Sequence, residues 1–218
     1  MAMTKPQAMK MTHLRSLRRG RCVRYALGQR SAATSPMASA KTAGRLMLVE
    51  LVNFACPHCR VESTYIPQVV SAMRGTGGRI EVAPLEPAPG AEPAPSVLAY
   101  YAELTAYPHA GIRAANALYS GYEQGAALDS ARSALSWLNL QGLPTAKAYA
   151  LLGSPDLHAR WARALRLAGL VHATSYPTFV AINRHTGYIE RVFRWHGHAG
   201  KLAASVVRYF TSKLPRGS

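Results

Sequence analysis

The sequence predicts an α/β protein in which helices flank a mixed β-sheet and an all-helical insertion separates the two halves of that sheet. Three observations lead to this prediction. A strand, a helix and a second strand follow one another early in the chain, five helical segments come next, and a hairpin with one more helix follows. A strand–helix–strand unit favours a right-handed parallel crossover, whereas a hairpin adds antiparallel strands. The length of 218 residues, 49% of them hydrophobic, suits one domain with a sizeable core, or one such domain plus an appendage.

The first half of the sheet is predicted from two apolar segments. Residues 46–52 form a nearly continuous apolar run that contains one acid, Glu50, which is typical of a buried central strand. A helical pattern follows from the cysteine pair onward, and Pro67 is expected to kink or end that helix. Residues 79–83 are predicted to form the second strand. Five prolines between residues 84 and 95 then predict a stiff, extended connection.

Helical patterning dominates the middle of the chain. The segments predicted to be helical are 96–107, 111–124, 128–140, 144–152 and 155–168. The last of them has the clearest ends, with Ser154 as N-cap, Pro155 at the first helical position and Gly169 at the end. Five tyrosines in this region are expected to pack in its core rather than line a groove, because they recur at helical spacing: Tyr100, Tyr101, Tyr107, Tyr119 and Tyr122.

The second half of the sheet is predicted to be a hairpin. Residues 178–183 and 188–193 have strand patterns on either side of a turn at 184–187, and an amphipathic helix follows over about 199–213. The chain is therefore expected to divide into a basic leader, a first sheet half, a helical insertion and a second sheet half. Their predicted bounds are 1–45, 46–95, 96–170 and 171–214.

The positive charge of the chain is concentrated in the leader. Of a formal net charge of +16, residues 1–45 contribute ten Lys or Arg and no acid, which leaves the body at +6. A basic front and the small residues Ala38-Ser39-Ala40 fit an export signal, although its apolar stretch is missing. Arg18-Arg19 suits a twin-arginine signal, and an organelle transit peptide or a solvated arm are alternatives. A periplasmic or otherwise exported protein is expected, with the cytoplasm as the alternative.

Two classes of partner are disfavoured by the same composition. Tyr25 is the one aromatic residue of the leader that could stack on a base, so nucleic-acid binding is not expected. No run approaches 18 consecutive apolar residues, so no membrane span is expected either.

The chemistry of the chain is predicted to lie in a cysteine pair. Cys56 and Cys59 are two residues apart at a strand-to-helix junction, where unpaired N–H groups favour a thiolate at the first cysteine. The second cysteine, one turn away, can form or resolve a disulfide with it. The imidazole of His58 between them further stabilises a thiolate and so makes the disulfide more oxidising. Pro57 suits the first helical position because its missing N–H would have no partner there.

Other roles for the cysteines and histidines are less well supported. A zinc site normally needs four ligands, and the sequence offers one cysteine pair with no matched second pair. A structural disulfide across so short a loop adds little stability, and Cys22 in the leader is expected to be incidental. His196 and His198 flank a glycine and suggest a solvated turn more than a metal site.

The sequence resembles the DsbA-like branch of the thioredoxin-fold thiol oxidoreductases. One match is Phe54-Ala55-Cys56-Pro57-His58-Cys59, whose Pro-His dipeptide is similar to that of the oxidases rather than the Gly-Pro of thioredoxins. The second is Thr174-Ser175-Tyr176-Pro177-Thr178-Phe179-Val180, similar to the family's loop in which a cis proline precedes a strand and faces the cysteines. The resemblance covers about residues 45–213 and implies a thioredoxin-like fold with a helical insertion.

The resemblance also implies roles for residues around the cysteines. A cis Pro177 would expose the backbone before it, so that an extended substrate pairs there and contacts Ser175 and Tyr176. Tyr176 is bulkier than is usual in the family and is expected to narrow the range of partners or to alter the redox potential. Glu50 lies at the position of the family's buried acid, for which a proton relay to the resolving thiol is suggested. The alternative for Glu50 is an acid paired with a base at the edge of the sheet.

The expected function is therefore that of a thiol:disulfide oxidoreductase that donates its Cys56–Cys59 disulfide to reduced exported proteins. Its partners would be reduced proteins or peptides and a separate reoxidising protein, in the membrane or soluble, and no cofactor beyond the cysteine pair is expected. Two alternatives remain open. One is a reductase or isomerase on the same fold, and the other is a non-catalytic binding or chaperone module that uses the groove at Pro177.

Overall fold

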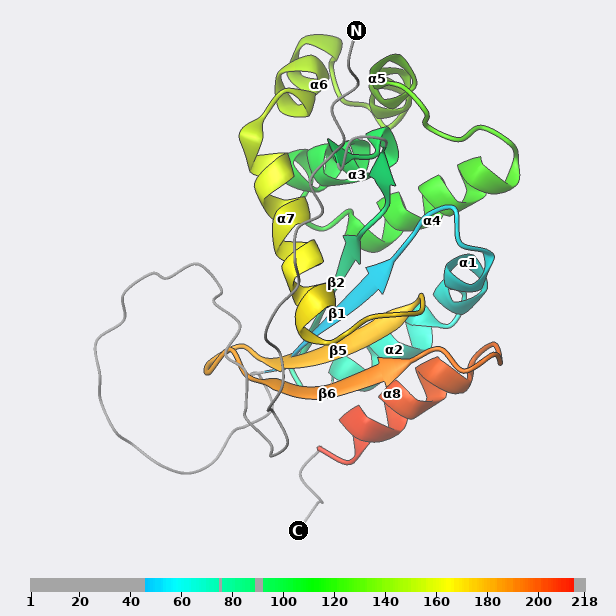
Figure 1. Cartoon of the computed structure of the whole chain (residues 1–218), viewed down its shortest axis with the longest axis vertical. Helices are drawn as coiled ribbons and strands as arrows, with labels where there is room; N and C mark the ends of the chain where they lie inside the picture. The colour runs from blue at the N-terminus through cyan, green and yellow to red at the C-terminus, as the bar shows by residue number, and fades with distance from the viewer. Residues whose placement is uncertain (1–45, 75, 89–91, 214–218) are drawn as a thin grey trace, which may run out of the picture.

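The computed structural model describes residues 46–74, 76–88 and 92–213, so the predicted leader and Cys22 lie outside the described residues. Its centre is a four-stranded mixed sheet in the order β2-β1-β5-β6 (Figure 1). The strands are β1 Leu46–Val52, β2 Arg79–Pro84, β5 Thr178–Asn183 and β6 Ile189–Arg194. β1 and β2 are parallel, and β5 is antiparallel to both β1 and β6. The predicted mixed α/β sheet is confirmed.

The inner position of β1 follows from its composition. A strand with neighbours on both edges and helices on both faces must be apolar throughout, and six of the seven residues of β1 are buried. Alternate residues of the strand point to opposite faces. Leu48 packs in the cluster formed with α2 and α8, and Val49 and Leu51 pack in the cluster formed with α7. The acid Glu50 is therefore enclosed, at 2% exposure.

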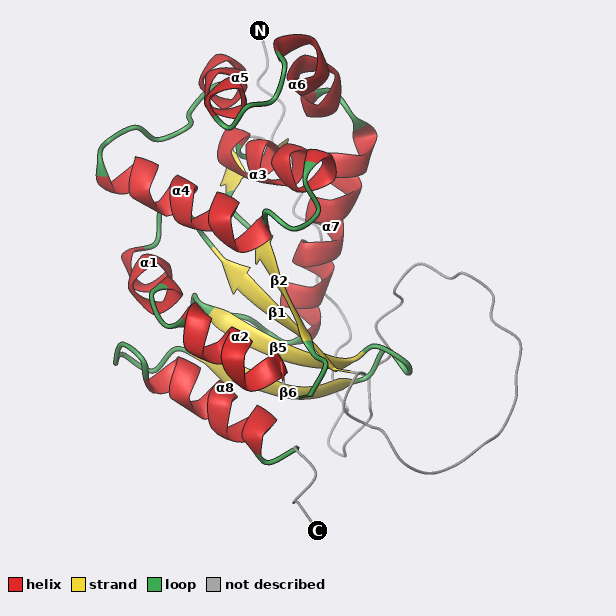
Figure 2. Ribbon diagram, turned by 180° about the vertical axis from the view of Figure 1, so that it is seen from behind, coloured by secondary structure: helices red, strands yellow, loops and turns green. Residues whose placement is uncertain are grey.

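Helices cover the two faces of the sheet unequally. Figure 2 shows α2 (Ile66–Arg74) and α8 (Lys201–Thr211) side by side on one face, whereas α7 (Pro155–Leu170) lies on the other. Leu202 and Phe210 of α8 are buried against the first face, and full burial of a large apolar side chain is worth about 2 kcal/mol. α1 (Pro57–Ser63) sits at the end of β1, at the margin of the sheet.

The single helix predicted after the cysteines is two helices. α1 ends at Ser63 and α2 begins at Ile66, so the predicted interruption at Pro67 is confirmed and falls just before the proline. In an unbroken helix the ring of Pro67 would clash with the carbonyl group of Ser63, four residues earlier. At the second position of a new helix the proline lacks no hydrogen bond, since the first N–H groups have no intrahelical partner.

The helical insertion is confirmed, with small differences at its ends. Its first four helices are α3 Pro95–Ala106, α4 Gly111–Glu123, α5 Ala131–Leu140 and α6 Thr145–Leu152, and α7 completes it. Ser154 caps α7 as predicted, but the helix continues through Gly169 to Leu170. The proline-rich connection is not simply extended, because β3 (Pro87–Ala88) and β4 (Glu92–Pro93) pair as a short antiparallel ladder.

Three of the five predicted core tyrosines are buried. Tyr100, Tyr101 and Tyr119 are each at most 3% exposed, and the Phe54 ring packs against Tyr100 and Tyr119 at centroid distances of 5.7 and 5.4 Å. Tyr107, by contrast, is 37% exposed. The residue two positions before Cys56 is thus anchored in the core of the helical insertion.

Candidate active site

The cysteine pair lies where β1 passes into α1. Cys56 is the N-cap of α1, with extended backbone angles of φ −82° and ψ 117°, and Pro57 follows at the first helical position. The side-chain oxygen of Asn53 accepts a hydrogen bond from the N–H of Ala55 at 2.8 Å, and the backbone carbonyl oxygen of Asn53 accepts one from the N–H of Cys56 at 3.0 Å. These two bonds fix the turn. Cys56 is half-buried and Cys59 is fully buried, and both are free thiols in the structure.

The surroundings of the two thiols differ in a way that favours one thiolate. A hydrogen bond from Cys59 is the largest influence that lowers the pKa of Cys56, to about 5, against the opposing effect of partial burial. The backbone N–H groups of Cys59 and His58 and the charge of His58 lower that pKa further. Burial, followed by the hydrogen bond to Cys56, raises the pKa of Cys59. Near neutral pH the pair therefore holds a thiolate at Cys56 and a thiol at Cys59.

The second predicted motif meets the first in space. The Tyr176–Pro177 peptide bond is cis, and the Cys56 sulfur lies 3.8 Å from the Tyr176 carbonyl oxygen. The Ser175 carbonyl oxygen accepts the hydroxyl group of Thr178 at 2.7 Å, so that oxygen already has a partner. Within the described residues, no hydrogen bond joins Ser175 to a cysteine. The structure thus brings Tyr176 and Pro177 to the thiol and leaves Ser175 one residue away.

The imidazole of His58 stacks on a residue that sequence analysis did not identify. The His58 and Trp195 rings have centroids 5.1 Å apart and planes inclined by 23°. Trp195 directly follows β6, and its ring is partly exposed. No spacing pattern links positions 58 and 195, because the contact depends on the path of the hairpin past α1.

Glu50 is enclosed beside the pair without a base. Its Oε1 atom has no hydrogen-bond partner among the described residues. Burial, and secondarily the charge of Glu62, raises the pKa of Glu50 to about 8. The charge of Glu50 in turn contributes to the raised pKa of Cys59. The alternative of an acid paired at the sheet edge is wrong, because β1 lies between β2 and β5 and no described base forms an ion pair with Glu50.

A second buried acid, Glu62, was not identified from the sequence. Its two oxygens accept the N–H groups of Gly200 at 2.9 Å and Ala203 at 2.7 Å, which ties α1 to the first turn of α8. Gly200 is the N-cap of α8 and has a φ of +73°, in the left-handed region. The only signal in the sequence was that Glu62 follows Cys59 by three residues, about one helical turn. The residues that bind Glu62 lie 138 and 141 positions further along the chain, so no local pattern could identify them.

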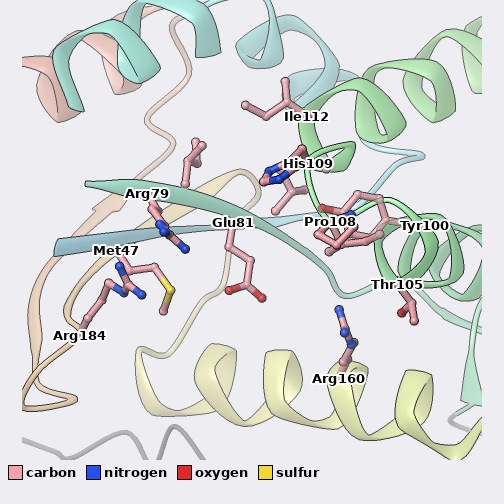
Figure 3. Close-up of a pocket in the computed structure, with 14 residues that line it drawn as sticks. Met47, Arg79, Glu81, Tyr100, Thr105, Pro108, His109, Ile112, Arg160 and Arg184 are labelled. Atoms are coloured by element: carbon pink, nitrogen blue, oxygen red, sulfur yellow. The ribbon is translucent and has the colours of Figure 1, made fainter. Parts of the chain in front are cut away.

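No alternative centre emerges from the described part of the chain. It contains no group of three or more metal-ligating side chains, and none of its helices is long and apolar enough to cross a membrane. A cleft of about 750 Å³ borders β2 and α7, and Figure 3 shows Arg79, Glu81 and Arg160 in it. Neither cysteine lines that cleft, so it is separate from the thiol chemistry.

Comparison with known proteins identifies the fold. The sequence matches no protein-family model and no curated protein. Among solved structures, the oxidoreductase DsbA from Xylella fastidiosa is similar over 80% of this chain and 88% of its own, with a TM-score of 0.57 and 19% identity. The chain has a DsbA-like thioredoxin fold.

Two further DsbA structures agree with this fold. DsbA1 from N. meningitidis covers 84% of this chain and 89% of its own, with a TM-score of 0.55 and 16% identity. DsbA from Pseudomonas aeruginosa covers 84% of this chain and 88% of its own, with a TM-score of 0.55 and 17% identity. The DsbA-like fold therefore confirms both the predicted resemblance and the predicted helical insertion in a thioredoxin-like sheet.

Proposed function

We propose that this protein is a thiol:disulfide oxidoreductase, and that it acts as an oxidase that donates a Cys56–Cys59 disulfide to reduced exported proteins. The observation that carries the proposal is the low pKa of a half-exposed Cys56 at a helix N-terminus, next to the cis bond of Pro177. Stabilising the thiolate stabilises the reduced pair, and a stabilised reduced pair makes the disulfide a stronger oxidant.

The transfer takes place in two exchange steps. A substrate thiolate attacks the sulfur of Cys56, the more exposed of the pair, and Cys59 leaves and takes up a proton. The second substrate thiol loses its proton and attacks the substrate sulfur of the mixed disulfide, and Cys56 leaves as a stable thiolate. Two electrons pass from the substrate to the enzyme. The substrate gains one disulfide, and the enzyme holds Cys56 as thiolate and Cys59 as thiol.

Glu50 is the proposed source of the proton for Cys59. A carboxyl group with a pKa of about 8 is largely protonated at neutral pH and can release a proton close to that pH. His58 is proposed to stabilise the Cys56 thiolate by its charge. We propose that an extended substrate segment binds along Ser175, Tyr176 and Pro177. Because the Tyr176 carbonyl group lies 3.8 Å from the Cys56 sulfur, a segment bound there would lie beside that sulfur.

The proposed partners are reduced substrate proteins and a separate protein that reoxidises the pair by accepting two electrons. No dissociable cofactor is required for thiol–disulfide exchange, because the electrons move between sulfur atoms. We place the protein outside the cytoplasm, in keeping with the basic leader and with the oxidising compartments in which disulfides persist.

The redox potential of the pair tests the direction of transfer. Equilibration with mixtures of reduced and oxidised glutathione should give a potential well above the value of about −270 mV that is typical of thioredoxin. A value near or below that figure would show a reductase and contradict the oxidase assignment. In the same assay, Cys56→Ser should abolish disulfide transfer completely. If the wild-type protein itself transfers no disulfide, so that Cys56→Ser leaves its behaviour unchanged, a non-catalytic binding module is indicated instead.

A further inference from the structure

The outer edge of β6 borders a second cleft. This cleft has a volume of about 330 Å³ and lies between the strand and the first turns of α8. β6 is the last strand of the described sheet, so no described strand pairs with its outer edge. Such an edge presents backbone N–H and C=O groups to an added strand. The residues that line the cleft are Arg191, Val192, Phe193, Arg194, His196, His198, Lys201, Leu202 and Ser205.

The lining of this cleft is basic and contains no acid. Arg191, Arg194 and Lys201 carry full positive charges, and His196 and His198 add two imidazoles. Arg194 donates a hydrogen bond to the Val171 carbonyl oxygen at 2.6 Å, which leaves its charge uncompensated because the acceptor is neutral.

The acids that belong to β6 or contact α8 already have partners elsewhere. Glu190 accepts the Tyr209 hydroxyl group at 2.7 Å and lies 3.7 Å from the Lys213 ammonium group. Glu62 accepts the backbone N–H groups at the start of α8. The exposed charges of Arg191 and Lys201 therefore face solvent without a carboxylate among the residues that line the cleft.

The cleft adjoins the redox pair through one residue. Trp195 lies between Arg194 and His196, which both line the cleft, and its ring stacks on His58 between the two cysteines. Figures 1 and 2 agree that the loop joining β6 to α8 lies beside α1. A segment bound along β6 would thus have its neighbouring residues close to Cys56.

The cleft at the opposite edge of the sheet provides a contrast. It is larger and also contains arginines, but Glu81 lies among Arg79, Arg160 and Arg184 (Figure 3). Its positive charge is partly neutralised by that carboxylate, and it does not adjoin the cysteines. An acidic partner that carries a thiol for oxidation is better matched to the cleft at β6.

We propose that the cleft between β6 and α8 docks an acidic, extended segment of the reduced substrate protein. This proposal rests on the proposed function and adds a substrate class to it. The backbone of the segment pairs with the outer edge of β6, and its carboxylates meet Lys201 and Arg191. Substrates with Asp or Glu near the reactive cysteine are then oxidised in preference to neutral or basic ones.

The first test compares three reduced peptides that share two cysteines and differ in flanking residues, which are Glu, Gln or Lys. With the oxidised full-length protein at low salt, the second-order rate constant should be about fivefold higher for the Glu peptide than for the Gln peptide, and lowest for the Lys peptide. Lys201→Glu should remove this preference. Equal rates for the three peptides would overturn the proposal.

A matched variant separates docking from the overall charge of the protein. Arg79→Glu makes the same change in charge at the opposite edge of the sheet, where the residue is exposed and lines the other cleft. The preference for the Glu peptide should persist in this variant. Loss of the preference to the same extent as in Lys201→Glu would show general electrostatic steering and would contradict a docking site.

A cysteine-free version of the Glu peptide tests the site directly. It should bind the wild-type protein in calorimetry and bind Lys201→Glu more weakly, whereas inorganic phosphate should not displace it at equal charge concentration. Absence of binding, or displacement by phosphate, would overturn the proposal. If no cysteine peptide is oxidised at all, the proposed function fails, and this binding measurement still decides the docking proposal.

Discussion

Glu50 and Glu62 are two enclosed carboxyl groups whose charges interact, and their surroundings differ sharply. Glu62 is fully buried and accepts two backbone N–H groups of α8, at the helix end where negative charge is favoured. Glu50 is 2% exposed, and its Oε1 atom has no described partner. Burial alone therefore does not define the role of an acid. A carboxylate with donors fixes structure, and one without donors is able to exchange a proton.

The largest expected effect is on folding, from Glu62. Glu62→Ala removes both acceptors and leaves the N–H group of Ala203 buried, and that of Gly200 partly buried, without partners. We expect the free energy of unfolding to fall by about 3 kcal/mol, measured by urea denaturation. Glu50→Gln should cost far less at pH 7, because it replaces a largely protonated carboxyl group with a neutral amide of the same shape. Equal losses from the two substitutions would show that Glu50 and Glu62 contribute equally to stability.

The next effect is on the pH dependence of stability, from Glu50. Its pKa is raised from 4.5 to about 8 in the folded state, so the folded protein binds the proton more tightly than the unfolded chain does. The contribution of a protonated Glu50 is complete below pH 4.5 and is lost as the pH rises towards 8. The wild-type free energy of unfolding should therefore fall over this window by a few kcal/mol relative to that of Glu50→Gln.

Urea midpoints of both proteins at several pH values check this sign. The difference between them should grow from pH 5 to pH 8, and a difference that stays constant would show that Glu50 does not titrate in this range. The same variant should also slow disulfide transfer by about tenfold or more, if Glu50 supplies the proton for Cys59. Glu86→Gln is the control for removing a carboxylate elsewhere, and it should leave the rate of transfer unchanged. Glu86 accepts hydrogen bonds from Ser96 and Tyr122 of the helical insertion.

The smallest effect is expected outside the buried pair, at Trp195. Replacing its ring by Leu frees the imidazole of His58 to swing away from Cys56, which weakens their charge interaction. The pKa of Cys56 should rise by about half a unit, measured from the ultraviolet absorbance of the thiolate as the pH is varied. Trp195→Phe keeps a ring for stacking and should restore most of the wild-type value. An unchanged pKa in Trp195→Leu would show that the stack does not position His58.

The parts of the structure that sequence predicted are those encoded by local pattern. The apolar run of β1, the cysteines at the start of α1 and the proline before β5 each carry their signal within a few residues. The interruption at Pro67 was predicted, but the residues at which α1 ends and α2 begins were not, since the effect of Pro67 on the preceding turn decides where the break falls. Local sequence therefore located the redox pair but not the ends of every helix.

The parts that sequence did not predict depend on contacts between distant segments. Trp195 contacts His58, and Glu62 binds the start of α8, because the hairpin and the last helix return to α1. Neither contact produces a periodic pattern in the sequence. The outcome for Glu50 likewise required the position of β1 inside the sheet, since the sequence alone allowed a paired acid at an edge. The roles of these residues depend on tertiary packing, which a local sequence pattern does not encode.

Gly200 sets a limit on the length of the loop that carries Trp195. A Cβ atom at this position would lie 2.9 Å from the Tyr65 ring, and the φ of +73° already disfavours any other residue. Glu62 holds one end of the loop at α8, and the stack on His58 holds the other. The loop is thus a spacer of fixed length, in which an added residue would displace either the indole or the helix. Insertions should be tolerated instead in the turn between β5 and β6, at the far end of the hairpin from the thiols.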